Sequence, residues 1–134
     1  MKLFEVELRL KYIDDSILYL EHWLSKDIKF SLNDINYFTL ILDELISERG
    51  KLSYIVDKVK VNNKFDKTAT IRQAELYKKG VEDRIKLNDF TLMSKVGEID
   101  ISDYIKKSIE LRDICNKIDE QILTISLMLE VDIS

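Results

Sequence analysis

The chain has 134 residues, enough for one domain with its own core; 46% of them are apolar and 34% are charged. This composition is typical of globular or coiled-coil proteins and excludes a disordered chain. The absence of proline and the presence of only three glycines argue against all-β and Rossmann-like folds, which need many turn residues. The net charge of −4 argues against general nucleic-acid binding, because such domains are basic.

Residues 3–25 are predicted to form the first helix. Apolar side chains recur there at steps of three and four from Leu3 to Leu24, which is the spacing of a helical seam. Residues 3–13 also fit a strand, since apolar and charged residues alternate from Phe4 to Tyr12. The heptad pattern continues far beyond the point at which the alternation stops, so we favour the helix.

The second helix is expected to start at Ser31, because Ser31 and Asp34 form a capping-box pattern. Its seam is apolar at every position except one: Ile35, Phe38, Leu42, Leu45, Arg49, Leu52, Val56 and Val59. Gly50 favours a kink or local break, since glycine costs a helix interior about 1 kcal/mol relative to alanine. Asn62 and Asn63 are expected to end the helix, because asparagine tolerates left-handed backbone.

A third helix is predicted to begin near Thr70, where Thr70 and Gln73 form another capping box. Its apolar seam is Ala74, Tyr77, Val81, Ile85 and Leu92. Residues 94–100 are expected to connect it to a fourth helix that starts near Ser102. Heptad spacing then runs from Ile101 to Leu129, and a second apolar row follows the same helix: Ile105, Ile109, Ile114, Leu123 and Leu127.

These segments predict an all-α fold in which residues 1–134 form a single domain. We expect four long amphipathic helices that form antiparallel helical hairpins or a four-helix bundle. The apolar faces are broader than one partner helix covers. This breadth indicates either a central position in the bundle or packing against another copy, so a homo-oligomer is expected.

The order of these features resembles the septicolysin-like family of small bacterial helical proteins. The chain opens "MKL" and enters a helix, "KVKVNN" leads through a short loop to "TIRQAELYKKG", and the last helix runs from "EIDISDYIKK" to "EVDIS". The positions that match the family's short motifs are Val61, Asn62, Asn63, Thr70, Ile71, Gln73 and Ala74. The joint before the last helix is shorter here than in the family. The resemblance implies a fold and no mechanism.

The N-terminal segment has charges at every second position, so it does not have the uninterrupted apolar region of a signal peptide. No run of about 18 apolar residues is present to span a bilayer. The single cysteine, Cys115, excludes an internal disulfide. We therefore expect a cytoplasmic protein that does not bind membranes.

Neither a catalytic site nor a metal site is predicted, and no cofactor is expected. Cys115 falls on the apolar seam of the last helix, which indicates a packing role and not a nucleophile. His22 is the only histidine, and zinc or di-iron sites need several such ligands. We expect His22 to be a surface or capping residue. Adjacent acidic pairs such as Asp14–Asp15 point about 100° apart on a helix and do not converge on one atom.

Positive charge gathers between Lys58 and Gly80, where seven Lys or Arg residues and two acids give +5. Free N–H groups at the start of a helix favour anions, so this stretch is a candidate site for a small anionic ligand. The candidate residues are Lys58, Lys60, Lys64, Lys67 and Arg72, together with Arg49 from the seam of the second helix. The alternative is a solvated connector, with Arg49 turned outward by a kink at Gly50 or paired with a carboxylate.

Three functional hypotheses follow. The first is a non-catalytic, homo-oligomeric helical protein that binds a protein partner, as inhibitors from phages and mobile elements often do. The alternative is a protein that sequesters or senses a small anionic ligand such as a nucleotide. An enzyme is the third and least favoured hypothesis.

Overall fold

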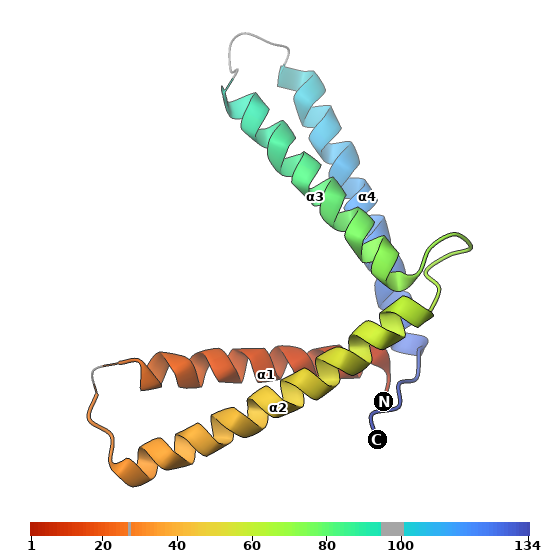
Figure 1. The fold of residues 1–134 in the computed structure, drawn as a ribbon. Helices are drawn as coiled ribbons and strands as arrows, with labels where there is room; N and C mark the ends of the chain where they lie inside the picture. Colours follow the sequence, from red (N-terminus) through yellow and green to blue (C-terminus); the bar gives the residue numbers. More distant parts are fainter. Residues whose placement is uncertain (27, 95–100) are drawn as a thin grey trace. The chain divides into compact units, whose positions relative to one another are not determined.

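The structure is a computed structural model that describes residues 1–26, 28–94 and 101–134. In these ranges the chain forms four helices: α1 (Leu3–Leu24), α2 (Leu32–Asn62), α3 (Ile71–Ser94) and α4 (Ile101–Met128). Helix α1 lies antiparallel to α2, and α3 lies antiparallel to α4 (Figure 1). The predicted all-α fold of long antiparallel helices is confirmed. Apart from Ser94, the predicted connector at residues 94–100 lies outside the described residues.

The described chain divides into two compact units. Unit 1 contains Met1–Val59 and Ser126–Ser134, and unit 2 contains Lys60–Ile125. Unit 1 is therefore the α1–α2 hairpin with the C-terminal segment, and unit 2 is mainly the α3–α4 hairpin. The single domain expected for residues 1–134 stays a prediction.

Helix α1 follows the predicted seam. Leu3, Val6, Ile13 and Ile17 are buried, and each lies three, four or seven residues from the next. At its start, the backbone N–H of Lys2 donates to the Glu5 carboxylate at 3.0 Å, which satisfies one of the donors that a helix end leaves open. The strand alternative for residues 3–13 is wrong, because the helical pattern buries one continuous stripe where the strand pattern would not.

Helix α2 starts where the capping pattern predicted. The backbone N–H of Asp34 donates to Ser31 Oγ at 3.1 Å, and the helix runs without interruption from Leu32 to Asn62. The break expected at Gly50 is absent. The seam is buried at Leu52 and Val56, whereas Ile35 near the start of the helix is 39% exposed. The first half of α2 is therefore covered less well than the second half.

Replacing Gly50 by alanine is expected to stabilise the protein by about 0.5–1 kcal/mol. A Cβ atom at this position would meet nothing within 4 Å, so the substitution gains helix propensity without a clash. Urea denaturation of the wild type and of Gly50→Ala measures this difference. An unchanged or lower midpoint would show that α2 needs the freedom of glycine at this point. Gly80→Ala, which is equally open in α3, is the matched comparison.

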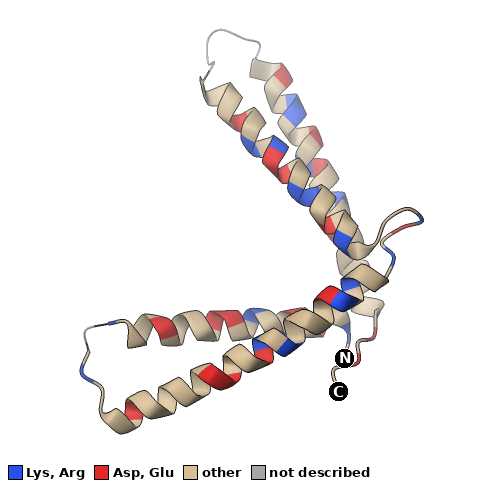
Figure 2. Ribbon diagram, viewed as in Figure 1, with Lys and Arg blue, Asp and Glu red and all other residues tan. Residues whose placement is uncertain are grey.

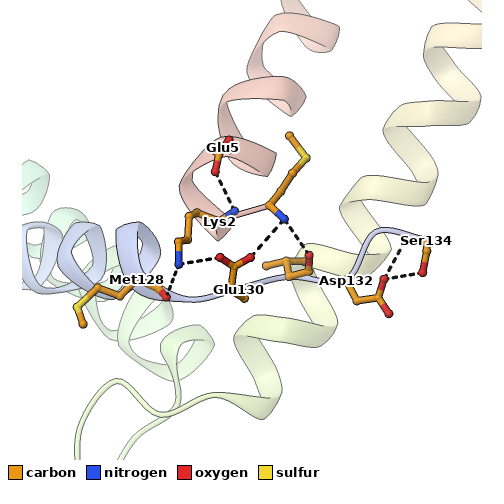
Figure 3. Close-up of polar contacts among 8 residues, drawn as sticks. Lys2, Glu5, Met128, Glu130, Asp132 and Ser134 are labelled. Carbon is orange, nitrogen blue, oxygen red and sulfur yellow. Dashed lines mark hydrogen bonds and ion pairs between the residues drawn. The ribbon is translucent and has the colours of Figure 1, made fainter.

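The last residues of the chain pack against the start of α1 within unit 1 (Figure 3). The N–H of Leu3 donates to the Leu129 carbonyl at 2.8 Å, and Lys2 Nζ lies 2.7 Å from the Glu130 carboxylate. Val131 is only 5% exposed. The heptad pattern predicted helix as far as Leu129, and α4 ends one residue earlier, at Met128. The residues that follow pair with the N-terminal residues through their backbone, which the sequence did not predict.

Unit 2 has a core in which Val81 and Ile85 of α3 meet Leu111 and Cys115 of α4. The predicted capping box is confirmed, since Gln73 N–H donates to Thr70 Oγ1 and Thr70 N–H donates to Gln73 Oε1. Two seam positions were wrong: Tyr77 of α3 is 57% exposed and Ile101 of α4 is 37% exposed. The second apolar row of α4 (Ile105, Ile109, Ile114, Leu123 and Leu127) is exposed, at 37–62% for each side chain.

Candidate functional site

An apolar hollow of unit 1 lies at the loop end of the α1–α2 hairpin. It has a volume of about 430 Å³, and its walls come from α1, the following loop and α2: Tyr19, Leu20, Trp23, Leu24, Ile28, Phe30 and Phe38. The aromatic rings meet edge to face, with Phe30 and Phe38 at 5.7 Å and Tyr19 and Trp23 at 6.3 Å between centroids. Such edge-to-face contacts are favourable, so the rings hold one another in place.

A second hollow of about 420 Å³ adjoins the first along the hairpin. It shares Tyr19 and Leu20 with the first hollow and extends it to Tyr12, Asp15, Ser16, Ile41 and Leu45. The two hollows form one groove between α1 and α2, which we call the α1–α2 groove. Its walls are apolar and aromatic except for Asp15 and Ser16. Grooves of this kind bind apolar ligands or the apolar face of a helix.

The helical segments that carry the groove contain acidic residues and no Lys or Arg. Residues 12–24 and 32–48 together hold seven Asp or Glu. The loop between them, which lines the groove with Ile28 and Phe30, adds Lys26, Lys29 and one aspartate, so residues 12–48 carry −6 in total. Figure 2 shows this separation: near the connecting loop, α1 and α2 carry red segments without blue ones. A groove between acidic helices creates a negative potential over an apolar surface.

Basic residues first appear on these helices where the acidic segments end. Arg9 of α1 forms a two-pronged contact with Glu48 of α2, with nitrogen–oxygen distances of 3.0 and 2.9 Å. This hydrogen bonding holds the pKa of the Glu48 carboxyl below its ordinary value. Arg49 of α2 lies 3.6 Å from the Asp14 carboxylate of α1. The expectation that Arg49 pairs with a carboxylate is confirmed, and α2 continues without a break past Gly50.

In unit 2, the loop between α2 and α3 satisfies its own backbone donors. The Asp66 carboxylate accepts hydrogen bonds from the N–H groups of Thr68 and Ala69, both at 2.8 Å. These hydrogen bonds, above all those from Thr68, hold the pKa of the Asp66 carboxyl below its ordinary value. Asp66 therefore satisfies donors of the loop, while at the start of α3 the Ile71 N–H donates to the Asn63 carbonyl at 3.0 Å and the Gln73 N–H to Thr70 Oγ1 at 3.2 Å.

Lys60, Glu75 and Arg72, all from the basic stretch, form a partly buried ion-pair cluster. Lys60 Nζ lies 2.8 Å from one oxygen of Glu75, and Arg72 lies 3.3 Å from the other. Lys60 is only 8% exposed, which is rare for lysine and requires such a partner. Glu75 thus pairs with two of the cations that were predicted to bind an anionic ligand.

The structure brings only some of the predicted anion-binding residues together. Lys60 and Arg72 meet at Glu75, whereas Lys64 and Lys67 are exposed in the loop that follows α2. Arg49 and Lys58 belong to unit 1, and the other four belong to unit 2. The anion site stays a prediction.

The surroundings of Cys115 and His22, the two residues considered for catalysis or metal binding, are those of structural residues. Cys115 is buried in the core of unit 2, and burial raises the pKa of its thiol, which makes the thiolate less available. His22 is exposed, with its ring 5.7 Å from that of Trp23. Among the described residues, no cluster of three or more His, Cys, Asp or Glu is placed to hold a metal ion. Within the same ranges, no helix is apolar and long enough to cross a membrane.

Comparison with protein-family models, curated proteins and solved structures finds no match for this chain. The resemblance to the septicolysin-like family therefore stays a prediction. The groove itself was missed in the sequence. The sequence feature that could have indicated it is the absence of Lys and Arg from residues 12–24 and 32–48, in contrast to the basic stretch from Lys58 to Gly80.

Proposed function

We propose that this protein is a non-catalytic helical interaction protein that binds a protein partner and also associates with copies of itself in the cytoplasm. One observation carries the proposal: large apolar side chains are exposed in rows along its helices. Soluble monomers rarely expose wide contiguous apolar patches, and such patches commonly mark interfaces. The α1–α2 groove is one such surface, and the second apolar row of α4 is another.

The α4 row is the surface that we assign to self-association. Ile105 and Ile109 are 47% and 62% exposed, and Leu123 is 46% exposed. At 100° per residue these three side chains lie within about 40° of one another round the helix. Burying such a stripe against the same stripe of a second copy gives the two-fold interface that is commonest in homo-oligomers.

Ile109→Lys with Leu123→Lys is expected to convert the oligomer to a monomer in sedimentation velocity at micromolar concentration. Each lysine places a charge where apolar area would otherwise be removed from water, and a second copy doubles the effect. Glu110→Lys is the control, because Glu110 is exposed on α4 but lies about 100° from Ile109. A wild-type monomer, or an oligomer that the double variant leaves intact, would contradict self-association through α4.

A further inference from the structure

We infer that the α1–α2 groove binds a Lys- or Arg-rich amphipathic helix of a partner protein. The inference rests on the proposed function, because it names the chemistry of the partner. The apolar face of that helix would lie in the groove, and its basic residues would lie along the acidic flanks.

The groove has the lining that a helix requires. An amphipathic helix presents apolar side chains at every third or fourth position along one face, and a hydrophobic groove between two helices receives them. Here two adjoining hollows of about 430 and 420 Å³ meet at Tyr19 and Leu20. Apolar side chains from successive turns of a bound helix can therefore enter one hollow and then the next. Trp23 lines the first hollow and is still 40% exposed, which leaves aromatic surface for a partner to cover.

Charge identifies the partner as basic. Five carboxylates on the groove-bearing segments form no ion pair with any described residue: Asp15, Glu21, Asp34, Asp43 and Glu44. Asp15 lines the groove, and Glu44 follows Ile41 of the groove wall by three residues on the same helix. Complementary charge speeds association and selects the partner, so a cationic helix is favoured over a neutral one.

The same charge disfavours other occupants. Packing this groove against its counterpart in a second copy would bring two acidic surfaces together, and like charges across an interface are costly. An anionic membrane surface is repelled for the same reason. The chain's own basic stretch has internal partners, since Lys60 pairs with Glu75 and Lys78 lies 2.6 Å from Asp119.

Trp23 provides the readout, because it is the only tryptophan in the sequence and lines the groove. The probes are two 14-residue amphipathic peptides without aromatic residues, with leucine at the same positions and either lysine or glutamate at all others. Titration with the lysine peptide is expected to shift the Trp23 emission to shorter wavelength with a Kd of about 10 μM. The glutamate peptide is expected to bind at least about tenfold more weakly.

Two double variants with the same change of charge separate a local effect from a general one. Asp15→Lys with Glu44→Lys reverses charge beside the groove and is expected to weaken the lysine peptide at least about tenfold. Glu21→Lys with Asp43→Lys is the control on the same two helices. At 100° per residue, Glu21 and Asp43 lie about 150° or more from the mean direction of the groove residues on their helices, whereas Asp15 and Glu44 lie about 90° from it. The control is expected to change affinity less than about threefold.

Three results would overturn the inference: no emission shift with the lysine peptide, equal affinity for both peptides, or equal weakening by both double variants. A shift that depends on protein concentration without peptide would mean that a second copy covers the groove, which also overturns it. These failures differ from failure of the proposed function, because self-association through α4 is measured without the peptides.

Discussion

Glu75→Ala is expected to lower the free energy of unfolding by about 2–3 kcal/mol. The substitution removes the carboxylate that lies 2.8 Å from Lys60 and 3.3 Å from Arg72. Lys60 is 8% exposed, so little water reaches its ammonium group to replace the favourable interaction with the Glu75 carboxylate. The expected loss lies below the range for fully buried pairs, because the Glu75 side chain is 29% exposed. Urea denaturation followed by far-ultraviolet circular dichroism measures it.

Two controls show whether burial of the pair is the cause. Glu82→Ala removes a carboxylate from the same helix, where it lies 3.3 Å from Lys78 and is 46% exposed. That surface pair is expected to contribute less than about 1 kcal/mol. Replacing both partners, as Lys60→Met with Glu75→Leu, is expected to restore most of the stability, because no buried charge remains. If Glu75→Ala cost no more than Glu82→Ala, the basic stretch would be a solvated surface.

Val131→Asp is expected to destabilise unit 1 by at least about 3 kcal/mol. Val131 is 5% exposed, and its backbone N–H donates to the Met1 carbonyl at 2.8 Å. A carboxylate there must be buried or must pull the C-terminal segment away from α1. Trp23 fluorescence during urea denaturation follows the unfolding of this unit, because Trp23 lies in α1.

The matched control for this variant is Met128→Asp. Met128 is the last residue of α4 and is 73% exposed, so the same charge is added without burial. A cost below about 1 kcal/mol is expected, mainly from an acid at the end of a helix where the dipole is negative. Equal effects of the two substitutions would mean that packing of residues 129–134 against the start of α1 does not stabilise unit 1.

Much of the fold could be predicted because local signals and packing agree. The seam of α1 was found from its spacing, since the same residues that repeat at helical intervals are the buried ones: Leu3, Val6, Ile13 and Ile17. The start of α3 was found from Thr70 and Gln73, because a capping box is a local structure written in four residues. Gly50 misled the prediction, since its weak preference against helix is outweighed by the contacts of a helix of 31 residues.

The rest depended on contacts between distant residues. The C-terminal segment leaves helical geometry because Leu129 and Val131 pair with the N-terminus, and no local pattern announces a partner more than 120 residues away. The charge of the basic stretch was visible, but the role of Glu75 was not. Lys60 and Glu75 are 15 residues apart, and the turn between α2 and α3 is what brings them together.

Native mass spectrometry of the protein purified gently from cells tests the central claim, that this chain acts by binding other protein chains. We expect an assembly heavier than one chain, made of further copies or of a partner chain, that separates into polypeptides on denaturation. A single chain alone would show that the protein does not act in this way. A single chain that carries only a few hundred daltons of small molecule would show the same, and would instead support ligand sequestration.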